Sequence, residues 1–280
     1  MTNHIRNLIV FGMLWFAGAA HADLVLGVHP FKPATTLTEA FTPLTRYLSE
    51  KLGQPVVLRI ARNYESHIDS VGRDEVDIAY MGPASYVKLR EHYGKYPLLA
   101  RQQIGAKPVF HSKIFVRTDS PVHTLSELAG KRFAFGEEHS TMSHLVPRYM
   151  LWQAGITVDK LASYKFVGDH VNVALGVLAG DFDAGAVKED VYFKYQPRGL
   201  REIATSAPYS DHVFVANKKV PPDLVRKLRD IMLHMNQDAQ GIAALQAMTK
   251  GITALVPAQD SDYDSLRVVL NKMRALGVSY

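Results

Sequence analysis

The sequence predicts an α/β protein that folds as two lobes with a ligand cleft between them. Short apolar runs alternate with stretches in which apolar residues recur every three or four positions, the pattern of strands and helices in a parallel or mixed sheet. This alternation occurs once before about residue 112 and again after it. The chain of 280 residues has no cysteine, so its fold depends on an apolar core rather than on disulfides.

The first half begins with the apolar run Asp23 to Val28, which ends at a turn and is followed by His29-Pro30. A helix follows in which Leu37 to Leu52 have helical spacing, and Gly53 marks its end. The expected elements are, in order, a strand at 23–28, a helix at 37–52, a strand at 56–60, a helix at 64–71 and a strand at 76–81.

The second half repeats this rhythm and then returns to helices. Its expected elements are a strand at 113–117, a helix at 125–129, a strand at 132–135, a helix ending at Gly155, a strand at 164–167, a helix at 171–179, strands at 182–187 and 212–216, and helices at 222–249 and 263–276. We expect lobe 1 to comprise residues 23–112 and 212–280, and lobe 2 residues 113–211. Two hinge crossings are expected near residues 111–117 and 205–215, with the ligand cleft between the lobes.

The amino terminus has the layout of a secretory signal peptide over residues 1–22. Arg6 precedes an apolar run from Leu8 to about Ala20, and Ala20-His21-Ala22 fits a small-residue cleavage site. We expect a soluble exported protein that begins near Asp23. A core helix at this position is the alternative interpretation.

Charge and histidine spacing argue against several other classes. Lysine and arginine exceed aspartate and glutamate only slightly, 32 against 27, and are scattered along the chain, so we expect no nucleic-acid partner. A mild attraction for small anions remains open. His139 and His144 lack the H-E-x-x-H pattern, so no metal site is predicted.

Three hydroxyl residues, Ser140, Thr141 and Ser143, gather with His144 where a helix begins. One capping hydroxyl would satisfy an ordinary helix start, and simple capping is the alternative interpretation. Free N–H groups and partial positive charge at a helix start hold phosphate-like anions, and extra hydroxyls add donors. The stretch therefore predicts a site for a tetrahedral oxyanion.

Several motifs together resemble a known family. They are "RNYESHIDSV", "DIAYMGPASYV", "VFHSKIFVR", "HSTMSHLVPRYML", "GDHVNVALGVLAGDFDAGAVKEDVY" and "ITALVPAQDSDYDSLR". In this order and spacing the chain resembles the PhnD-like substrate-binding proteins of ABC transporters for phosphate, phosphite and phosphonate. The resemblance implies a type II periplasmic-binding fold, a periplasmic monomer with no cofactor and no catalytic residue, and delivery of a small oxyanion to an ABC permease.

The resemblance also implies which residues bind the ligand. They are Tyr64, Tyr80, Phe110, Ser140, Thr141, Ser143, His144, His170 and Asp190. Phe110 stands where relatives often have tyrosine, so one hydroxyl donor is absent. Lys188 and Glu189 lie beside Asp190, and the sequence leaves open which of the three faces the cleft.

Two alternative functions stay open at this stage. The closed lobes could present the bound anion to a membrane sensor kinase or cyclase instead of a permease. An exported hydrolase could use Ser140 or Ser143 with a histidine and Asp169 or Asp190. The chain has no G-x-S-x-G motif, which argues against the hydrolase.

Overall fold

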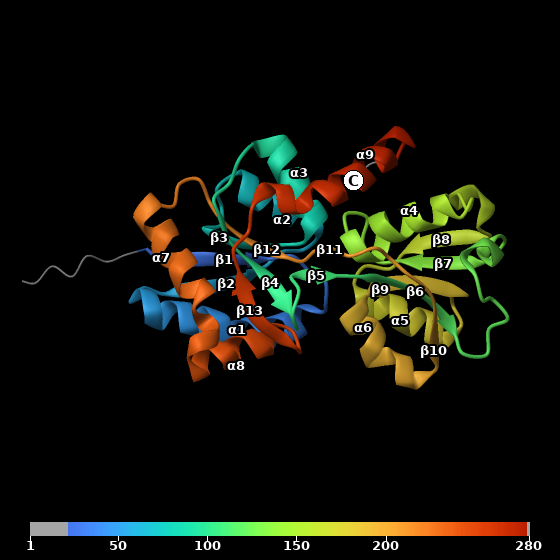
Figure 1. Ribbon diagram of the computed structural model, residues 1–280, viewed down its shortest axis with the longest axis horizontal. Helices are drawn as coiled ribbons and strands as arrows, with labels where there is room; N and C mark the ends of the chain where they lie inside the picture. The colour runs from blue at the N-terminus through green and yellow to red at the C-terminus, as the bar shows by residue number, and fades with distance from the viewer. Residues whose placement is uncertain (1–21, 279–280) are drawn as a thin grey trace, which may run out of the picture.

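The computed structural model describes residues 22–278, and these form two lobes, each built around its own sheet (Figure 1). Residues 1–21, which hold nearly all of the predicted signal peptide, lie outside the described residues. Within the described part, no helix is long and apolar enough to cross a membrane.

Lobe 1 contains a six-stranded sheet with the order β13-β4-β12-β3-β1-β2. The strands are β1 (Leu24–Val28), β2 (Val56–Ile60), β3 (Ile78–Met81), β4 (Leu98–Ile104), β12 (Val213–Ala216) and β13 (Ile252–Val256). Strand β1 pairs in parallel with β2 and β3, whereas β12 and β13 pair antiparallel with their neighbours. The carboxyl ends of β1 and β3 therefore meet at one edge of the sheet.

Helices cover both faces of this sheet, and its central strands β1, β3 and β12 are apolar on both sides. The helices are α1 (Ala34–Leu52), α7 (Pro222–Leu233) and α8 (Ala239–Met248) with one core cluster, and α2 (Tyr64–Gly72), α3 (Pro83–Tyr93) and α9 (Asp264–Ala275) with the other. Along β3, Ile78 and Tyr80 join the first cluster while Ala79 and Met81 join the second, as the alternation of strand side chains requires.

Lobe 2 contains a five-stranded sheet with the order β10-β6-β9-β7-β8. Its strands are β6 (Ser112–Arg117), β7 (Arg132–Phe135), β8 (Ser163–Phe166), β9 (Ala184–Lys188) and β10 (Leu200–Thr205). Its α-helices are α4 (Val146–Gln153), α5 (His170–Ala179) and α6 (Glu189–Tyr195). Apolar side chains of this sheet again form two clusters, one on each face.

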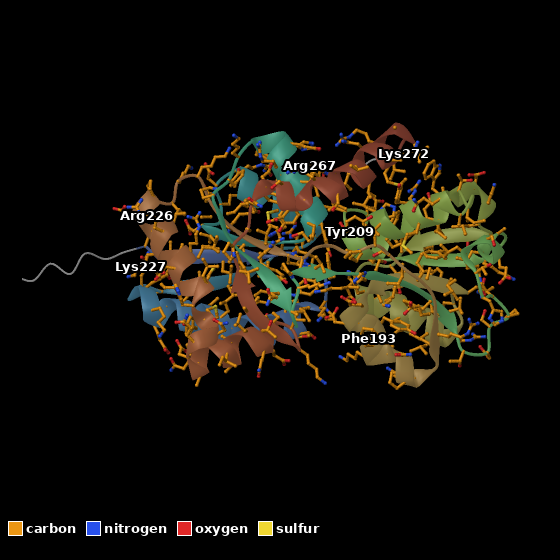
Figure 2. All side chains as sticks on the ribbon, in the orientation of Figure 1. Phe193, Tyr209, Arg226, Lys227, Arg267 and Lys272 are labelled. Atoms are coloured by element: carbon orange, nitrogen blue, oxygen red, sulfur yellow. The ribbon has the colours of Figure 1, made fainter. Side chains whose placement is uncertain are left out.

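The chain crosses between the lobes twice, and the crossings pair with each other. Strands β5 (Val109–Phe110) and β11 (Tyr209–Ser210) form a short antiparallel ribbon. Figure 2 shows Tyr209 in the region between the two lobes. The first crossing lies a few residues before the predicted segment 111–117, because residues 112–117 belong to the sheet of lobe 2.

Helix α9 lies along both lobes, beside α3 and toward α4 (Figure 1). One apolar cluster contains Leu266 and Leu270 of this helix together with Met142 and Leu145 of lobe 2. The carboxy-terminal helix therefore packs the lobes together on the side away from α1.

Most predicted elements are confirmed to within three residues, and one is wrong. The helix predicted at 222–249 is two helices, because α7 ends at Leu233 and Asp238 begins α8 as its cap, accepting the Gly241 N–H at 2.7 Å. Helices α3 and α6 and strands β4, β10 and β13 were not predicted. Gly82-Pro83 was interpreted as a turn, whereas Pro83 occupies the first turn of α3, where its missing N–H costs nothing.

Candidate anion-binding site

An enclosed cavity lies between the lobes at the crossing. The cavity volume open to the centre of a water molecule is about 10 Å³, so the cavity has room for roughly one water molecule. The lining residues come from lobe 1, the crossings and lobe 2, and they are His29, Phe31, Tyr64, Gly82, Phe110, Ser140, Thr141, Met142, His170, Lys188 and His212. The lobes are therefore closed around a very small space.

The hydroxyl-rich stretch enters the cavity through an unusual helix start. Residues Thr141–Leu145 form one wide π-helical turn before α4, with the Leu145 N–H bonded to the Ser140 carbonyl at 3.0 Å. Pro147 has no N–H to give the Ser143 carbonyl, and that carbonyl instead accepts the Gly136 N–H at 3.0 Å. The turn is thus anchored to the end of β7.

The hydroxyls of this turn differ in their roles. Ser143 donates both its hydroxyl (2.8 Å) and its N–H (3.3 Å) to the Ser140 oxygen, and the Ser140 hydroxyl also has the Tyr64 hydroxyl as a hydrogen-bond partner. The Thr141 hydroxyl oxygen accepts the Ala84 N–H from the start of α3 at 3.0 Å, which leaves the Thr141 hydroxyl hydrogen available. Among residues 22–278 the N–H groups of Thr141 and Met142 have no partner. The turn therefore offers several donors to a ligand.

His170 offers a further donor, because its tautomer is fixed. Its Nδ1 accepts the Lys188 N–H at 3.0 Å, so a neutral ring carries its hydrogen on Nε2. Burial lowers the pKa of His170 to about 3, which keeps the ring neutral. Its Nε2 lies 3.3 Å from the Ser140 oxygen and lines the cavity.

Lys188 brings a buried positive charge to the cavity. Its side chain is 3% exposed, and its Nζ lies 3.7 Å from Asp211 Oδ1 but makes no hydrogen bond among the described residues. Burial opposes the charge, yet Asp211 and Asp190 raise the pKa of Lys188. A buried ammonium whose hydrogens have no acceptor among the described residues, in a cavity lined by donors, is suited to an anion.

Lys188 is thus the residue of the Lys188–Asp190 segment that lines the cavity. Asp190 instead pairs with Lys32 of lobe 1 at 3.0 Å, and Glu189 accepts the His111 N–H at 3.2 Å. Burial acts to raise the pKa of Asp190, but the charges of Lys188 and Lys32 outweigh it and lower that pKa. The ion pair of Asp190 therefore joins the lobes beside the cavity.

Of the other predicted site residues, Tyr64 and Phe110 line the cavity, whereas Tyr80, Ser143 and His144 do not. Tyr80 lies behind the wall and donates its hydroxyl to Gln102 at 2.7 Å. His144 turns away, since its Nδ1 bonds the Glu138 carbonyl oxygen at 2.6 Å. The prediction that His144 faces the ligand therefore does not match this arrangement, because the helical turn points its side chain into lobe 2.

Sequence reasoning missed His29, Phe31, Met142 and His212, which all line the cavity. One signal was available, because His29 and Gly82 directly follow β1 and β3, parallel neighbours whose carboxyl ends meet at one edge. His212 carried no such signal, since its position depends on the antiparallel return of the chain through β12.

Glu137 stands at the mouth of the cleft rather than in the cavity. With Asn63 and His139 it lines a separate open hollow between the lobes. Its carboxylate accepts the Tyr64 N–H at the start of α2, and burial raises the pKa of Glu137 to about 7. The start of α2 therefore has its anion already, in contrast to the Thr141 turn.

Two lobes, paired crossings and an enclosed site of donors and one ammonium define a solute-binding protein of the periplasmic type. The sequence model of the family described as "ABC transporter, phosphonate, periplasmic substrate-binding protein" matches residues 26–263. The chain belongs to this family.

Individual relatives agree with this assignment. The chain is 26% identical over 273 residues to the phosphate-import protein PhnD of Mycolicibacterium smegmatis, covering 88% of this chain and 84% of that protein. It is 24% identical over 270 residues to the probable ABC transporter phosphite binding protein PhnD1 of Prochlorococcus marinus, covering 90% and 91%. The solved structure of that PhnD1 with methylphosphonate superposes with a TM-score of 0.80 at 22% identity, covering 90% and 98%, which supports the fold.

Proposed function

We propose that this protein captures a small phosphorus oxyanion, of the phosphonate, phosphite or phosphate type, and delivers it to an ABC permease. The observation that carries the proposal is the buried ammonium of Lys188, which makes no hydrogen bond among the described residues and shares the cavity with Ser140, Thr141 and His170. These groups complement a compact anion with several oxygens. The family membership supplies the class of partner.

The charge and size of the cavity favour small ligands. The walls contributed by Phe31, Phe110 and Met142 are apolar, so they suit a short organic substituent better than a long polar one. A micromolar dissociation constant corresponds to about −8 kcal/mol. A few charge-assisted hydrogen bonds, each worth about 1.5 to 3 kcal/mol net, supply that amount after closure and desolvation.

The same geometry argues against serine hydrolysis at this site. His170 carries its hydrogen on the nitrogen nearest Ser140, so it cannot take a proton from that hydroxyl. Asp169 caps α5 through the N–H groups of Val171 and Asn172 and does not orient the ring. We therefore expect saturable binding without turnover of phosphate or acyl esters.

The oligomeric state and receiving partner form a further part of the proposal. Both lobes contribute to one complete cavity within a single chain, so a monomer suffices for binding. We propose the permease as the receiving partner. The alternative, a membrane sensor, is distinguished by whether import of the ligand stops when the protein is deleted.

Calorimetry of the purified chain with methylphosphonate, phosphite, phosphate and sulfate tests the proposal. We expect at least one phosphorus oxyanion to bind with a dissociation constant of about 1 μM or tighter. A bulky phosphate ester serves as the matched control and is expected to bind much more weakly. Absence of binding to every phosphorus oxyanion would refute the proposed function.

A further inference from the structure

Two imidazole nitrogens face the cavity without a hydrogen-bond partner within residues 22–278. His29 and His212 both use Nδ1 elsewhere: the first lies 3.1 Å from the Tyr80 carbonyl oxygen and the second 2.8 Å from Asp211 Oδ1. Their Nε2 atoms point to Gly82, where an added Cβ would lie 3.5 Å from the first and 3.8 Å from the second. Both rings are buried and line the cavity, stacked with centroids 5.2 Å apart.

The partners of Nδ1 determine where each ring carries its hydrogen. A carbonyl oxygen and an ionised carboxylate only accept hydrogen bonds, so Nδ1 is the donor in both rings. Burial lowers the pKa of His29 and of His212, and the rings are neutral at physiological pH. Each Nε2 therefore presents a bare lone pair to the cavity.

Asp211 is held firmly in its orienting role. Its Oδ2 accepts Gln102 Nε2 at 3.3 Å, and its Oδ1 accepts the His212 N–H at 2.7 Å besides the ring nitrogen. Burial acts to raise the pKa of Asp211, but Lys188 and His212 lower it, so the carboxylate stays ionised. The hydrogen of His212 is thereby fixed on Nδ1.

The charges around the two rings cancel. Lys188 faces Asp211, and Lys32 pairs with Asp190, which gives two cations against two anions. The remaining titratable groups packed around the rings are neutral, and they are Tyr64, His67, Tyr80 and His170. The cavity thus combines two acceptors with no net charge, which favours a monoanion over a dianion.

Given the proposed function, we infer that His29 and His212 set specificity by accepting a hydrogen bond from a protonated ligand oxygen. The site then retains oxyanions that carry an acidic hydrogen when bound, and it rejects oxyanions such as sulfate that carry none. An unprotonated oxygen against a bare Nε2 would place two acceptors together, and each buried, unsatisfied acceptor weakens binding.

Binding of a protonated ligand oxygen also affects how many protons are taken up from solution. Above its second pKa, methylphosphonate is a dianion in solution and must acquire a proton from water or buffer when it binds. That proton lies between a ligand oxygen and Nε2, and one hydrogen bond forms whichever of the two atoms carries it. Binding at alkaline pH is therefore coupled to proton uptake.

Calorimetry with methylphosphonate at about pH 8.5, in two buffers of different ionisation enthalpy, measures this uptake, and about one proton per bound ligand is expected. Glu137, with its pKa of about 7, is ionised there in the closed form and adds little. Sulfate is expected to bind about tenfold to a hundredfold more weakly than methylphosphonate. Binding of methylphosphonate without proton uptake, or equal affinity for sulfate, would overturn the inference while leaving the proposed function intact.

Substitutions of the two histidines test whether they cause the proton uptake and the preference over sulfate. In the double variant His29→Gln with His212→Gln, amide N–H groups can replace the lone pairs, so uptake falls toward zero and the preference over sulfate shrinks by about tenfold. His67→Gln is the matched control, because His67 is equally buried but bonds the Tyr80 carbonyl oxygen and does not line the cavity. Unchanged uptake in the folded double variant would also overturn the inference. If the double variant fails to fold, the two wild-type measurements still decide.

Discussion

The two walls of the cavity differ in what they offer a ligand. Lobe 2 presents Ser140, Thr141 and His170 as donors, together with the ammonium of Lys188. Lobe 1 contributes the His29 nitrogen as an acceptor, and the second crossing adds that of His212. Tyr64 is the exception, a lobe 1 residue with a hydroxyl donor. The comparison suggests that the charged oxygens of a ligand face lobe 2 and a protonated oxygen faces lobe 1.

Two helix starts at the cleft differ in their caps, that of α2 in lobe 1 and the Thr141 turn in lobe 2. In lobe 1 the start of α2 is filled by the carboxylate of Glu137 and the side chain of Asn63, and the Ala84 N–H of α3 is bonded to Thr141. In lobe 2 the Thr141 turn is capped only by the neutral hydroxyl of Ser140. A helix start capped without charge keeps its attraction for an anion.

The largest effect is expected from removing the cation of the lobe 2 wall. Lys188→Met should weaken methylphosphonate binding by about a hundredfold or more, since a charged hydrogen bond is lost. It should also lower the free energy of unfolding by about 3 kcal/mol, because Asp211 remains buried with its charge less compensated. Calorimetry and denaturant unfolding measure the two effects.

A matched double variant separates the effect on affinity from the effect on stability. Lys188→Met with Asp211→Asn removes both charges and should recover much of the stability but not the affinity. Recovery of affinity in the double variant would show that Lys188 acts only through Asp211 and does not itself bind the anion.

A smaller loss is expected from Thr141, whose hydroxyl both faces the cavity and bonds the Ala84 N–H of lobe 1. Thr141→Val should weaken binding by roughly tenfold to a hundredfold, because it leaves polar groups unpaired in the closed cavity. Thr141→Ser keeps the hydroxyl and should bind nearly as wild type. Equal affinities of the valine and serine variants in calorimetry would contradict a donor role.

Two ligands that differ in one amine test the charge of the cavity. No carboxylate lines the cavity, and Lys188 already places an ammonium there. Aminoethylphosphonate should therefore bind about tenfold more weakly than ethylphosphonate, which has nearly the same size without the amine, since burying a second cation is unfavourable. A competition assay compares the two, and tighter binding of the amine would mean that Asp190 or Asp211 reaches the ligand.

Glu137 should have the smallest effect on affinity and a distinct pH dependence. Its pKa is raised to about 7 by burial, so the stabilisation is complete at low pH and is lost as pH rises through about 7. Compared with wild type, Glu137→Gln should be more stable by about 1 to 2 kcal/mol at about pH 8 and no more stable at about pH 4. Thermal unfolding across this range checks it, and a constant difference would assign the effect to packing rather than titration.

The sequence predicted strands such as β3, β9 and β12, whose residues are all buried, whereas it did not predict β4, β10 and β13, which are partly exposed. Helix α3 was missed because Gly82-Pro83 reads equally as a turn or as a helix start. The sequence predicted one helix where α7 and α8 are separate, because the capping role of Asp238 is recognised only when the break between the helices is known.

The candidate site was predictable where local sequence determines the chemistry. Ser140 and Thr141 line the cavity because a helix start positions them. Asp190 could not be placed, because its partner Lys32 is distant in sequence and belongs to the other lobe. His212 faces the cavity through an antiparallel return strand, and such long-range pairing leaves no local pattern.

A crystal structure with methylphosphonate tests the two-walled cavity most directly. The account predicts the phosphorus between the lobes, with oxygens within hydrogen-bond distance of Thr141 and Lys188 Nζ and one oxygen against Nε2 of His29 or His212. An anion bound outside this cavity, or one whose oxygens all face lobe 2 while both Nε2 atoms remain unpaired, would contradict it.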